Sequence, residues 1–358
     1  MSRSKKRIGI VGGGINGVVT AWQLALDGHE VDLFERDTLM SATSRSSSKL
    51  LHGGLRYLEN GEFGLVQEAL KERDEWLKRA PDLTRSLRLL LPIYSNAKRS
   101  AWKVRIGLGL YDLLAGSSTL PKSRKLSKAE VLEREPSLKP EGLRGGFLFS
   151  DGQMDDEALG LWVADQARRQ GVSFHERTEI QALDPTGSVF ISNGEARQFD
   201  HVFNIAGPWA EQLLNKSNIE SPYTLDLVRG SHLILERKCQ QPCLLEFPDE
   251  NRVFFVLPWH GKTLVGTTEV RQSLSDPIHC SDDERQYLLR AFQHYFPQES
   301  VEVVETFAGV RPLIYGAKDP GKATREYAIF SNQKLTTVFG GKWTTATALA
   351  KKLVKTLH

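Results

Sequence analysis

The first forty residues carry the clearest alternation of apolar and polar positions in the chain. An apolar run at 8–11 precedes apolar residues at helical spacing from Val18 to Leu26, and a second apolar run follows at 31–34. Short apolar runs bounded by glycine are typical of buried strands, whereas a 3.6-residue spacing is typical of a helix. The pattern therefore predicts a strand, a helix that stops at Gly28, and a second strand.

The later pattern predicts a mixture of helices and strands. Helices are expected at 62–80, from a capping box at Ser127 to the residue before Pro136, from the aspartates at 155–156 to Arg169, at about 281–295, and from Thr344 to the end. Strands are expected at 145–150, 172–180, 189–192, 199–205, 224–236, 252–258, 264–266 and just before Gly340. We expect residues 81–121 to be less regular.

A glycine motif joins the first predicted strand to the first predicted helix. Gly12, Gly14 and Gly17 have the G-x-G-x-x-G spacing, and Glu35 closes the second strand. Such glycines allow a tight turn, a close approach of a pyrophosphate to the backbone, and close packing of helix on strand. An acid at this position can accept hydrogen bonds from ribose hydroxyls. The unit predicts a dinucleotide site and leaves FAD and NAD open; the alternative is a glycine-rich turn in another α/β protein.

Residues 41–58 are rich in serine and run into His52-Gly53-Gly54. By composition the first half of this stretch is also consistent with a flexible linker. Because it follows a predicted dinucleotide unit directly, we favour a loop whose small hydroxyl groups and amides line the cofactor. Residues 98–116 combine basic residues, a tryptophan and an apolar run, which indicates either a segment lying on a membrane surface or an ordinary packed helix.

Composition narrows the class of protein. A chain of 358 residues is long enough for about two domains. With 40% hydrophobic and 25% charged residues and a net charge of +3, it is typical of globular proteins and lacks the charge expected of a general nucleic-acid-binding surface. Its three cysteines form neither a zinc set nor a C-x-x-C pair, so no metal site is predicted. The early first strand and the absence of a run of about 20 apolar residues predict a cytoplasmic protein.

Cationic residues and histidines lie beside turn glycines in several short clusters. Each one alone has an ordinary explanation as a surface charge or a hydrogen-bonded core histidine. Together they form the set that a pocket for a small phosphorylated alcohol requires. The clusters are centred on His52, Arg56 and Tyr57, on His232, on Arg311, on Arg325, and on Lys342.

At these residues the chain resembles the FAD-dependent glycerol-3-phosphate dehydrogenases, within the wider group of D-amino-acid-oxidase-like flavin oxidoreductases. The resemblance extends from end to end. It rests on GGGINGV at 12–18, ATSRSSSKLLHGGLRYLE at 42–59, RIGLGLYD at 105–112, the aspartates at 155–156, NIAGPW at 204–209, RGSH at 229–232, VLPW at 256–259, GTTEV at 266–270, GVRPL at 309–313, TREY at 324–327 and VFGGKWTT at 338–345.

The resemblance implies a fold and an organisation. The fold class is α/β (α+β overall), with a discontinuous Rossmann-like FAD-binding domain and an inserted substrate domain built on a mixed or antiparallel sheet. The FAD-binding domain would comprise residues 1–80, 145–215 and 300–358. The substrate-binding domain would comprise residues 81–144 and 216–299. Cofactor-like features at both ends of the chain are consistent with this division.

The resemblance also implies a reaction and its residues. The C2 hydrogen of sn-glycerol 3-phosphate would pass as hydride to flavin N5, giving dihydroxyacetone phosphate, with electrons passed on to a quinone or another acceptor. His232 would be the base and Arg311 would stabilise the alkoxide. Arg56, Tyr57, Arg325 and Lys342 would bind the phosphate. The FAD site would comprise Gly12, Gly14, Ile15, Asn16, Gly17, Glu35, Arg36, Thr43, Ser44, Ser47, Lys49, Leu50, His52, Gly53, Gly54, Leu55, Ala206, Gly207, Gly309, Arg311, Gly341, Lys342, Trp343 and Thr344.

Three features depart from the family pattern. Longer members continue past the Gly-Gly-Lys helix into a helical C-terminal domain, whereas this chain stops at His358. Residues 204–209 lack the usual threonine of Ala-Thr-Gly, and the loop at 316–324 is short and different.

The expected partners are a phosphorylated polyol, a quinone and the inner membrane surface; the oligomeric state stays open. The alternatives are a flavoenzyme for a 2-hydroxy acid, an amine or another phosphorylated polyol, an oxygen-using oxidase, and a flavoprotein without turnover that serves in assembly.

Overall fold

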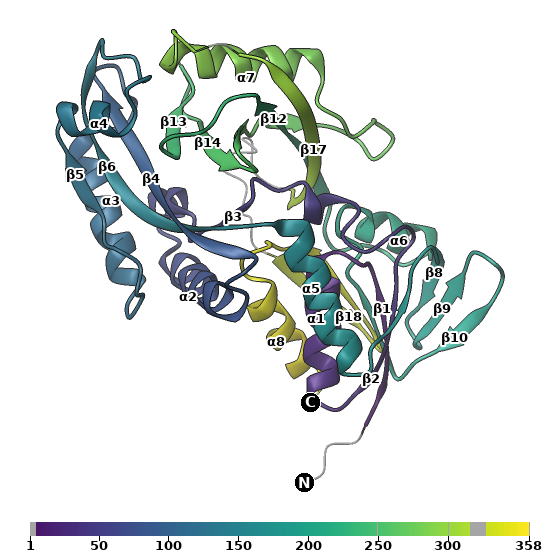
Figure 1. Cartoon of the computed structure of the whole chain (residues 1–358). Coiled ribbons are helices and arrows are strands. Elements are labelled where there is room, and N and C mark those ends of the chain that lie inside the picture. The colour runs from purple at the N-terminus through teal and green to yellow at the C-terminus, as the bar shows by residue number, and fades with distance from the viewer. Residues whose placement is uncertain (1–4, 249, 300, 316–326, 358) are drawn as a thin grey trace.

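A computed structural model describes residues 5–248, 250–299, 301–315 and 327–357. Its strands form three sheets, two of which are large, and the fold is mixed α/β, as predicted (Figure 1). The first large sheet has the strand order β18 (Tyr327–Asn332), β19 (Leu335–Gly340), β11 (His201–Asn204), β1 (Arg7–Val11), β2 (Glu30–Phe34) and β7 (Ser173–His175). Its neighbours pair in parallel, except β18 with β19.

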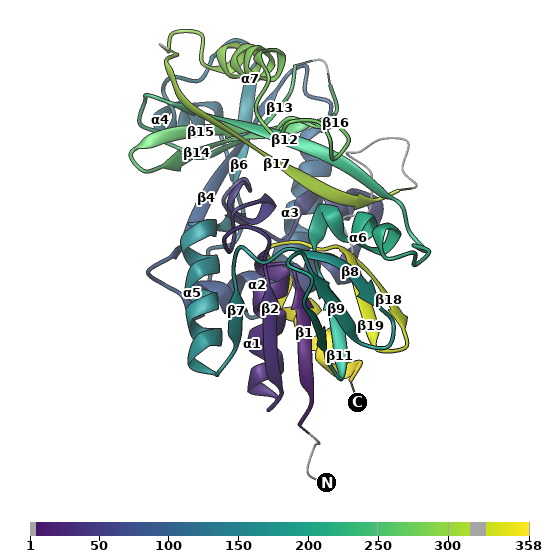
Figure 2. The ribbon, with the colours of Figure 1, turned by 90° about the vertical axis from the view of Figure 1, so that its right-hand side faces the viewer.

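The first sheet is buried on both faces, as parallel sheets are. Side chains on alternate positions of β1 and β2 pack against α1 (Ile15–Leu26), α5 (Asp156–Arg169) and α8 (Ala346–Lys355). The opposite face packs against α6 (Ala210–Lys216) and a three-stranded sheet of β8 (Ile180–Asp184), β9 (Ser188–Ile191) and β10 (Ala196–Gln198). Figure 1 shows these layers side by side, and Figure 2 views the same stack from the side of β8, β9 and β10.

The second large sheet has ten strands. Its order is β16 (Val270–Arg271), β12 (Leu225–Leu235), β15 (Lys262–Gly266), β14 (Val253–Trp259), β13 (Cys243–Glu246), β4 (Thr84–Tyr94), β6 (Leu143–Met154) and β3 (Leu50–Leu51), with β17 (Val303–Ile314) paired to β12 and β5 (Arg124–Leu126) to β6. One face packs on α4 (Lys128–Arg134) and α7 (Asp282–Tyr295), and the other on η2 (Leu55–Asn60), α2 (Phe63–Arg79) and α3 (Ala101–Leu114).

The first predicted unit is confirmed as β1, α1 and β2, and Gly28 follows α1 in a left-handed conformation. The capping box at Ser127 and the Asp155 cap of α5 are confirmed as well. The prediction that 81–121 is less regular was wrong, because β4 runs through its first part as an eleven-residue strand. Arg85 and Arg88 obscured the apolar pattern there; they bind the neighbouring strand through Gln153 and Ser150.

The predicted domain boundaries stay a prediction. In hydrogen bonding, β6 and β17 belong to the ten-stranded sheet, although the boundaries assign most of their residues to the FAD-binding domain. Both strands carry residues from one large sheet toward the other, as the long curve of β6 in Figure 1 shows. Among the described residues, no helix is both long enough and apolar enough to cross a membrane.

Candidate active site

A cavity of about 750 Å³ is lined by residues from both large sheets. Its walls come from the turn between β1 and α1, the serine-rich loop, η2, β12, β17 and the connection from β19 to α8. This volume lies in the usual range for small-molecule and cofactor sites. Segments far apart in the sequence therefore meet around one space, at the ends of the parallel strands where α/β proteins bind ligands.

The glycine turn at the start of α1 is shaped by close backbone packing. Gly12 has φ +115°, and a Cβ there would lie 2.3 Å from the carbonyl oxygen of Ile205. A Cβ on Gly17 would lie 1.9 Å from the carbonyl oxygen of Gly12. The first turn of α1 contains no acidic residue, and its N-terminus has no side-chain cap from Gly14. The positive end of the helix dipole thus faces the cavity, and no acidic side chain of the helix's own first turn neutralises it.

Glu35 lies at the end of β2, on the wall of the cavity. Its carboxylate accepts hydrogen bonds from the amides of Gly13 (2.7 Å) and Asp37 (2.9 Å). These bonds fix the acid beside the glycine turn, where a ribose would lie if a dinucleotide followed the wall. Arg36 lines the same end and stacks its guanidinium 4.6 Å from the Trp209 ring.

The serine-rich loop is an ordered wall of the cavity. Ser44 Oγ accepts the Ile15 amide at 2.9 Å, and Thr43 Oγ1 donates to the Val310 carbonyl at 2.7 Å. A Cβ on Gly309 would lie 2.9 Å from the backbone oxygen of Ser46, so a larger residue would push β17 away from the loop. The loop therefore connects the N-terminus of α1 to the strand that carries Arg311.

The loop is closed by a buried ion pair behind the cavity. Lys49 Nζ lies 2.6 Å from Asp156 Oδ1, and Ser47 donates from both its amide and its hydroxyl to Asp156 Oδ2. Burial raises the pKa of Asp156, while the Lys49 ammonium opposes that shift. Lys49 is thus bound to α5 and does not line the cavity.

A second buried polar cluster supports the loop of His52, Gly53 and Gly54. The Gly53 amide donates to the Tyr111 hydroxyl at 2.8 Å, and this hydroxyl donates to Asp151 at 2.7 Å. Arg73 donates to the same carboxylate at 3.1 Å. Burial raises the pKa of Asp151 to about 6, against the opposing effect of Arg73. A Cβ on Gly53 would lie 2.6 Å from the Leu70 side chain, so a larger residue would have to displace that side chain.

His232 lies in the middle of β12, 2% exposed and on the cavity wall. Its Nε2 shares a 2.9 Å hydrogen bond with Ser48 Oγ, and its ring stacks on Phe307 with centroids 4.7 Å apart. Burial, and then the positive charges of Lys49 and Arg311, lower its pKa to about 3. The imidazole is therefore neutral at physiological pH and can accept a proton.

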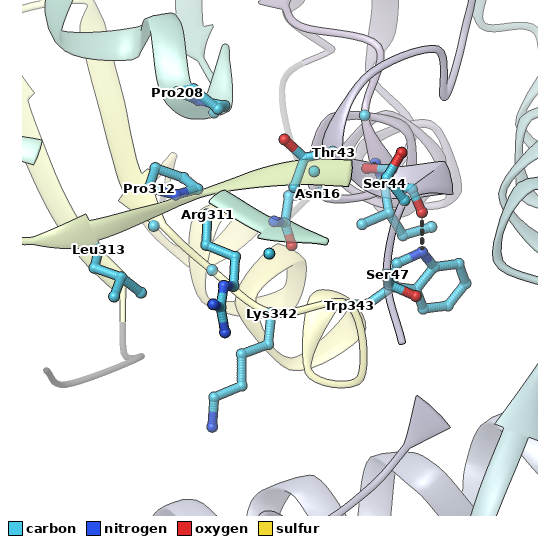
Figure 3. A pocket seen from close by; sticks show the side chains of 18 of the residues that line it. Asn16, Thr43, Ser44, Ser47, Pro208, Arg311, Pro312, Leu313, Lys342 and Trp343 are labelled. Atoms are coloured by element: carbon cyan, nitrogen blue, oxygen red, sulfur yellow. Dashed lines mark hydrogen bonds between the residues drawn. The ribbon is translucent and has the colours of Figure 1, made fainter. Parts of the chain in front are cut away.

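Cationic side chains gather at the same end of the cavity. Arg311, on β17, lies 3.6 Å from Glu269 and donates to the Thr268 carbonyl at 3.2 Å. Glu269, 7% exposed, also pairs with Arg252 at 3.3 Å. Lys342 Nζ lies 3.8 Å above the Tyr57 ring. Figure 3 shows the Arg311 and Lys342 side chains extending from separate elements into the same open space.

Most of the predicted site residues line this cavity. They are Gly12, Gly14, Ile15, Asn16, Glu35, Arg36, Thr43, Ser44, Ser47, Leu50, His52, Gly54, Leu55, Arg56, Tyr57, Ala206, Gly207, His232, Gly309, Arg311, Gly341, Lys342, Trp343 and Thr344. Gly17, Lys49 and Gly53 lie behind the lining, where their contacts are with the protein itself. Arg325 and the loop at 316–324 fall outside the described residues.

The structure adds residues that the sequence analysis did not single out. Ser48 contacts His232, Glu269 lies between Arg311 and Arg252, and Asp151 lines the wall near His52. Ser48 lies in the motif at 42–59 and Glu269 in the motif at 266–270. Membership in these motifs was the only sign in the sequence that either residue belongs to the site. Their roles depend on partners in other segments of the chain, His232 for Ser48 and Arg252 and Arg311 for Glu269, so residue spacing along the chain did not reveal them.

Residues 7–356 match the family model described as FAD dependent oxidoreductase. The glycerol-3-phosphate dehydrogenase of Pseudomonas aeruginosa is 36% identical over 98% of this chain and 71% of its own length. The D-erythritol 1-phosphate dehydrogenase of Brucella abortus is 36% identical over 96% of this chain and 72% of its own.

Solved structures show the same fold. The glycerol-3-phosphate dehydrogenase of Bacillus halodurans, complexed with FAD, has a TM-score of 0.76 at 25% identity; the match covers 100% of this chain and 65% of that one. The L-alpha-glycerophosphate oxidase of Mycoplasma pneumoniae, with FAD bound, has a TM-score of 0.79 at 20% identity over 99% and 95% of the two chains. This chain thus spans about two thirds of the Bacillus protein.

Proposed function

The chain belongs to the family of FAD-dependent oxidoreductases, with FAD as its cofactor, and we propose that it oxidises sn-glycerol 3-phosphate to dihydroxyacetone phosphate. The observation that carries this proposal is the meeting of His232, Arg311 and Lys342 at one end of the cavity. A neutral base beside two cations suits an alcohol that carries a phosphate.

The other end of the cavity suits the dinucleotide part of FAD. Asn16 Oδ1 is buried and has no hydrogen-bond partner among the described residues, so a donor from a ligand would satisfy it. The N-terminus of α1 offers backbone amides for the diphosphate, and Glu35 offers a carboxylate for the ribose. We assign the adenosine to Glu35 and the isoalloxazine to the loop of His52–Gly54.

FAD would supply the acceptor for the C2 hydride at its N5 atom. His232 would remove the proton of the C2 hydroxyl through Nε2 or Nδ1, because its ring is neutral. Ser48 holds the Nε2 side of the ring, and Nδ1 has no hydrogen-bond partner among the described residues. Stacking on Phe307 fixes the plane of the ring, so that proton transfer has a defined direction.

Arg311 would stabilise negative charge on the substrate oxygen as the proton leaves. Glu269 and the Thr268 carbonyl hold its guanidinium in place. This preorganisation makes an electrostatic contribution effective in a site that excludes water. The phosphate would bind Lys342, Arg56 and Tyr57, and we keep Arg325 as a fourth phosphate ligand from the sequence analysis.

The N-terminus of α8 would stabilise the reduced cofactor. Its first turn contains no acidic residue, and Trp343 and Thr344 line the cavity just before it. Trp343 is held by its indole N–H, which donates to the Ser44 carbonyl at 3.2 Å (Figure 3). A helix dipole directed at the flavin would favour negative charge on its ring.

A second substrate has a specific observation in its favour. The Brucella relative is named for D-erythritol 1-phosphate, a four-carbon phosphorylated polyol, and it is as similar to this chain as the Pseudomonas relative. Arg252 and Asn251 also line the cavity and would offer donors to a longer polyol. Anaerobic bleaching of the bound flavin by each compound in turn distinguishes the two substrates.

We propose a quinone as electron acceptor, reached from the cytoplasmic face of the membrane, with oxygen as the alternative. The basis is α3, which exposes Trp102 (62%), Ile106 (61%) and Leu113 (74%). Lys98, Lys103 and Arg105 are exposed around this apolar face. We do not count Arg99 among the basic residues that would face the membrane, because its guanidinium is bound to Glu59 and Glu246. Apolar side chains flanked by basic ones suit an anionic lipid surface.

Charge removal from α3 tests this membrane proposal. In a vesicle sedimentation assay, the variant K98Q/K103Q/R105Q should bind phosphatidylglycerol-rich vesicles about 100-fold more weakly than wild type, because each basic residue near the surface contributes about 1 kcal/mol. The control R169Q/K334Q/K355Q removes three exposed charges elsewhere and should bind like wild type. Equal weakening in both variants would show that net charge, not α3, determines binding.

A further inference from the structure

The chain contains two capping boxes that differ in what their glutamates contact. At α4, Glu130 bonds Ser127 and Arg124, and its side chain is 39% exposed. At α7, Glu284 makes the same capping contacts with Ser281, but its side chain is 5% exposed. A cap needs only the bonds to the first turn, so burial of the second glutamate calls for another explanation.

Glu284 also binds three groups outside its helix. Its Oε1 accepts from Ser231 Oγ at 2.8 Å and from Thr268 Oγ1 at 2.6 Å. Its Oε2 lies 2.8 Å from Arg229 Nη2. Burial alone would raise the pKa of this carboxyl, but the hydrogen bonds from Thr268 and Ser231 outweigh that and hold it below its usual range. The carboxylate is therefore charged and fully occupied.

Two of these contacts, those with Ser231 and Thr268, lead to groups that we place in the reaction. Ser231 is the neighbour of His232 on β12, and its amide donates to Thr268 Oγ1 at 2.9 Å. Thr268 in turn accepts from Arg311 through its carbonyl, at 3.2 Å. One carboxylate on α7 thus joins the strand that presents His232 to the segment on which Arg311 rests.

We propose that Glu284 is a positioning residue, which fixes the relative placement of His232 and Arg311 through Ser231 and Thr268. The proposal rests on the function proposed above for these two side chains. It also explains why arginine and serine precede the histidine in the RGSH motif at 229–232: both bind Glu284. Small displacements of catalytic groups reduce rates by up to about 100-fold.

The test compares Glu284→Gln and Glu284→Met with Glu130→Gln and Glu130→Met in the FAD-loaded protein. The amide keeps one acceptor oxygen for Ser231 and Thr268, whereas methionine keeps none. We expect flavin reduction at saturating substrate to slow about 10-fold for Glu284→Gln and about 100-fold for Glu284→Met. Both Glu130 variants should stay within about twofold of wild type, with FAD content unchanged in all four.

Hydrogen exchange supplies a readout that does not need turnover. In the oxidised holoenzyme, Glu284→Met should increase amide exchange in residues 229–233 and 266–271, and Glu130→Met should not. A Glu284 variant that is less stable but whose flavin is reduced at the wild-type rate would overturn the proposal. Slowed flavin reduction with unchanged amide exchange in both segments would also overturn it. If wild type is reduced by no phosphorylated polyol, the proposed function fails, and the exchange comparison alone decides the role of Glu284.

Discussion

The His232→Asn variant should reduce its flavin about 100-fold or more slowly than wild type when sn-glycerol 3-phosphate is added without oxygen. Asparagine fills similar space and can bond Ser48, but it cannot take a proton near neutral pH. Stopped-flow absorbance of the bound flavin measures the rate directly. His201→Asn is the matched control, since His201 is also buried with its pKa lowered to about 4, yet it binds Thr336 away from the cavity.

The pH dependence of the wild-type rate tests the same role. A base acts in its unprotonated form, and the folded protein holds the pKa of His232 near 3. His232 should therefore stay neutral, and the reduction rate should not fall, as pH decreases from about 7 to 5. A loss of rate with a midpoint near pH 6.5, the ordinary pKa of histidine, would contradict the desolvated environment described for this ring. In the variant experiment, a wild-type rate in His232→Asn would exclude His232 as the base.

The Arg311→Met variant should lose about 100-fold or more in the maximal rate of flavin reduction, because it removes the charge that we propose stabilises the developing alkoxide. Methionine fills the volume without the charge, and Arg311→Lys should recover part of the rate. Arg271→Met is the matched control. Arg271 lies on β16, which, like β17, pairs with β12. Its side chain binds Asp226 and is 46% exposed.

The dependence on substrate concentration separates two roles for Arg311. Loss in the maximal rate with similar substrate affinity places it at the reacting oxygen. Loss in affinity with an unchanged maximal rate would place it with Lys342 at the phosphate and contradict our assignment. Measuring FAD content beforehand excludes a simple loss of cofactor, since Arg311 also lines the cavity to which we assign the flavin.

Local signals in the sequence were sufficient for the first unit of the fold. Gly12 and Gly17 have steric requirements that follow from neighbouring backbone, and Gly14 lies against the Ser44 hydroxyl. Glu35 follows a strand whose end is fixed by its apolar pattern. The long strand β4 was missed because Arg85 and Arg88, three positions apart, interrupt the alternation of apolar and polar residues. Their partners lie on β6, which no reading of one segment reveals.

The candidate site shows the same limit more clearly. His232, Arg311 and Lys342 were identified through motifs, and the structure brings them to one cavity from β12, β17 and the turn before α8. Glu269 and Glu284 were not identified, because the roles that we propose for them depend on which side chains surround them. A glutamate in a capping box looks the same in the sequence at 130 and at 284; only tertiary packing distinguishes them.

Anaerobic titration of the FAD-loaded protein tests the central claim most directly. Separate samples would receive sn-glycerol 3-phosphate, D-erythritol 1-phosphate, a 2-hydroxy acid and an amine, and the flavin absorbance would be followed in each. We predict that sn-glycerol 3-phosphate bleaches the flavin fastest and that dihydroxyacetone phosphate accumulates in equal amount to the reduced flavin. Bleaching by the hydroxy acid or the amine alone would contradict the proposal that this site oxidises a phosphorylated alcohol.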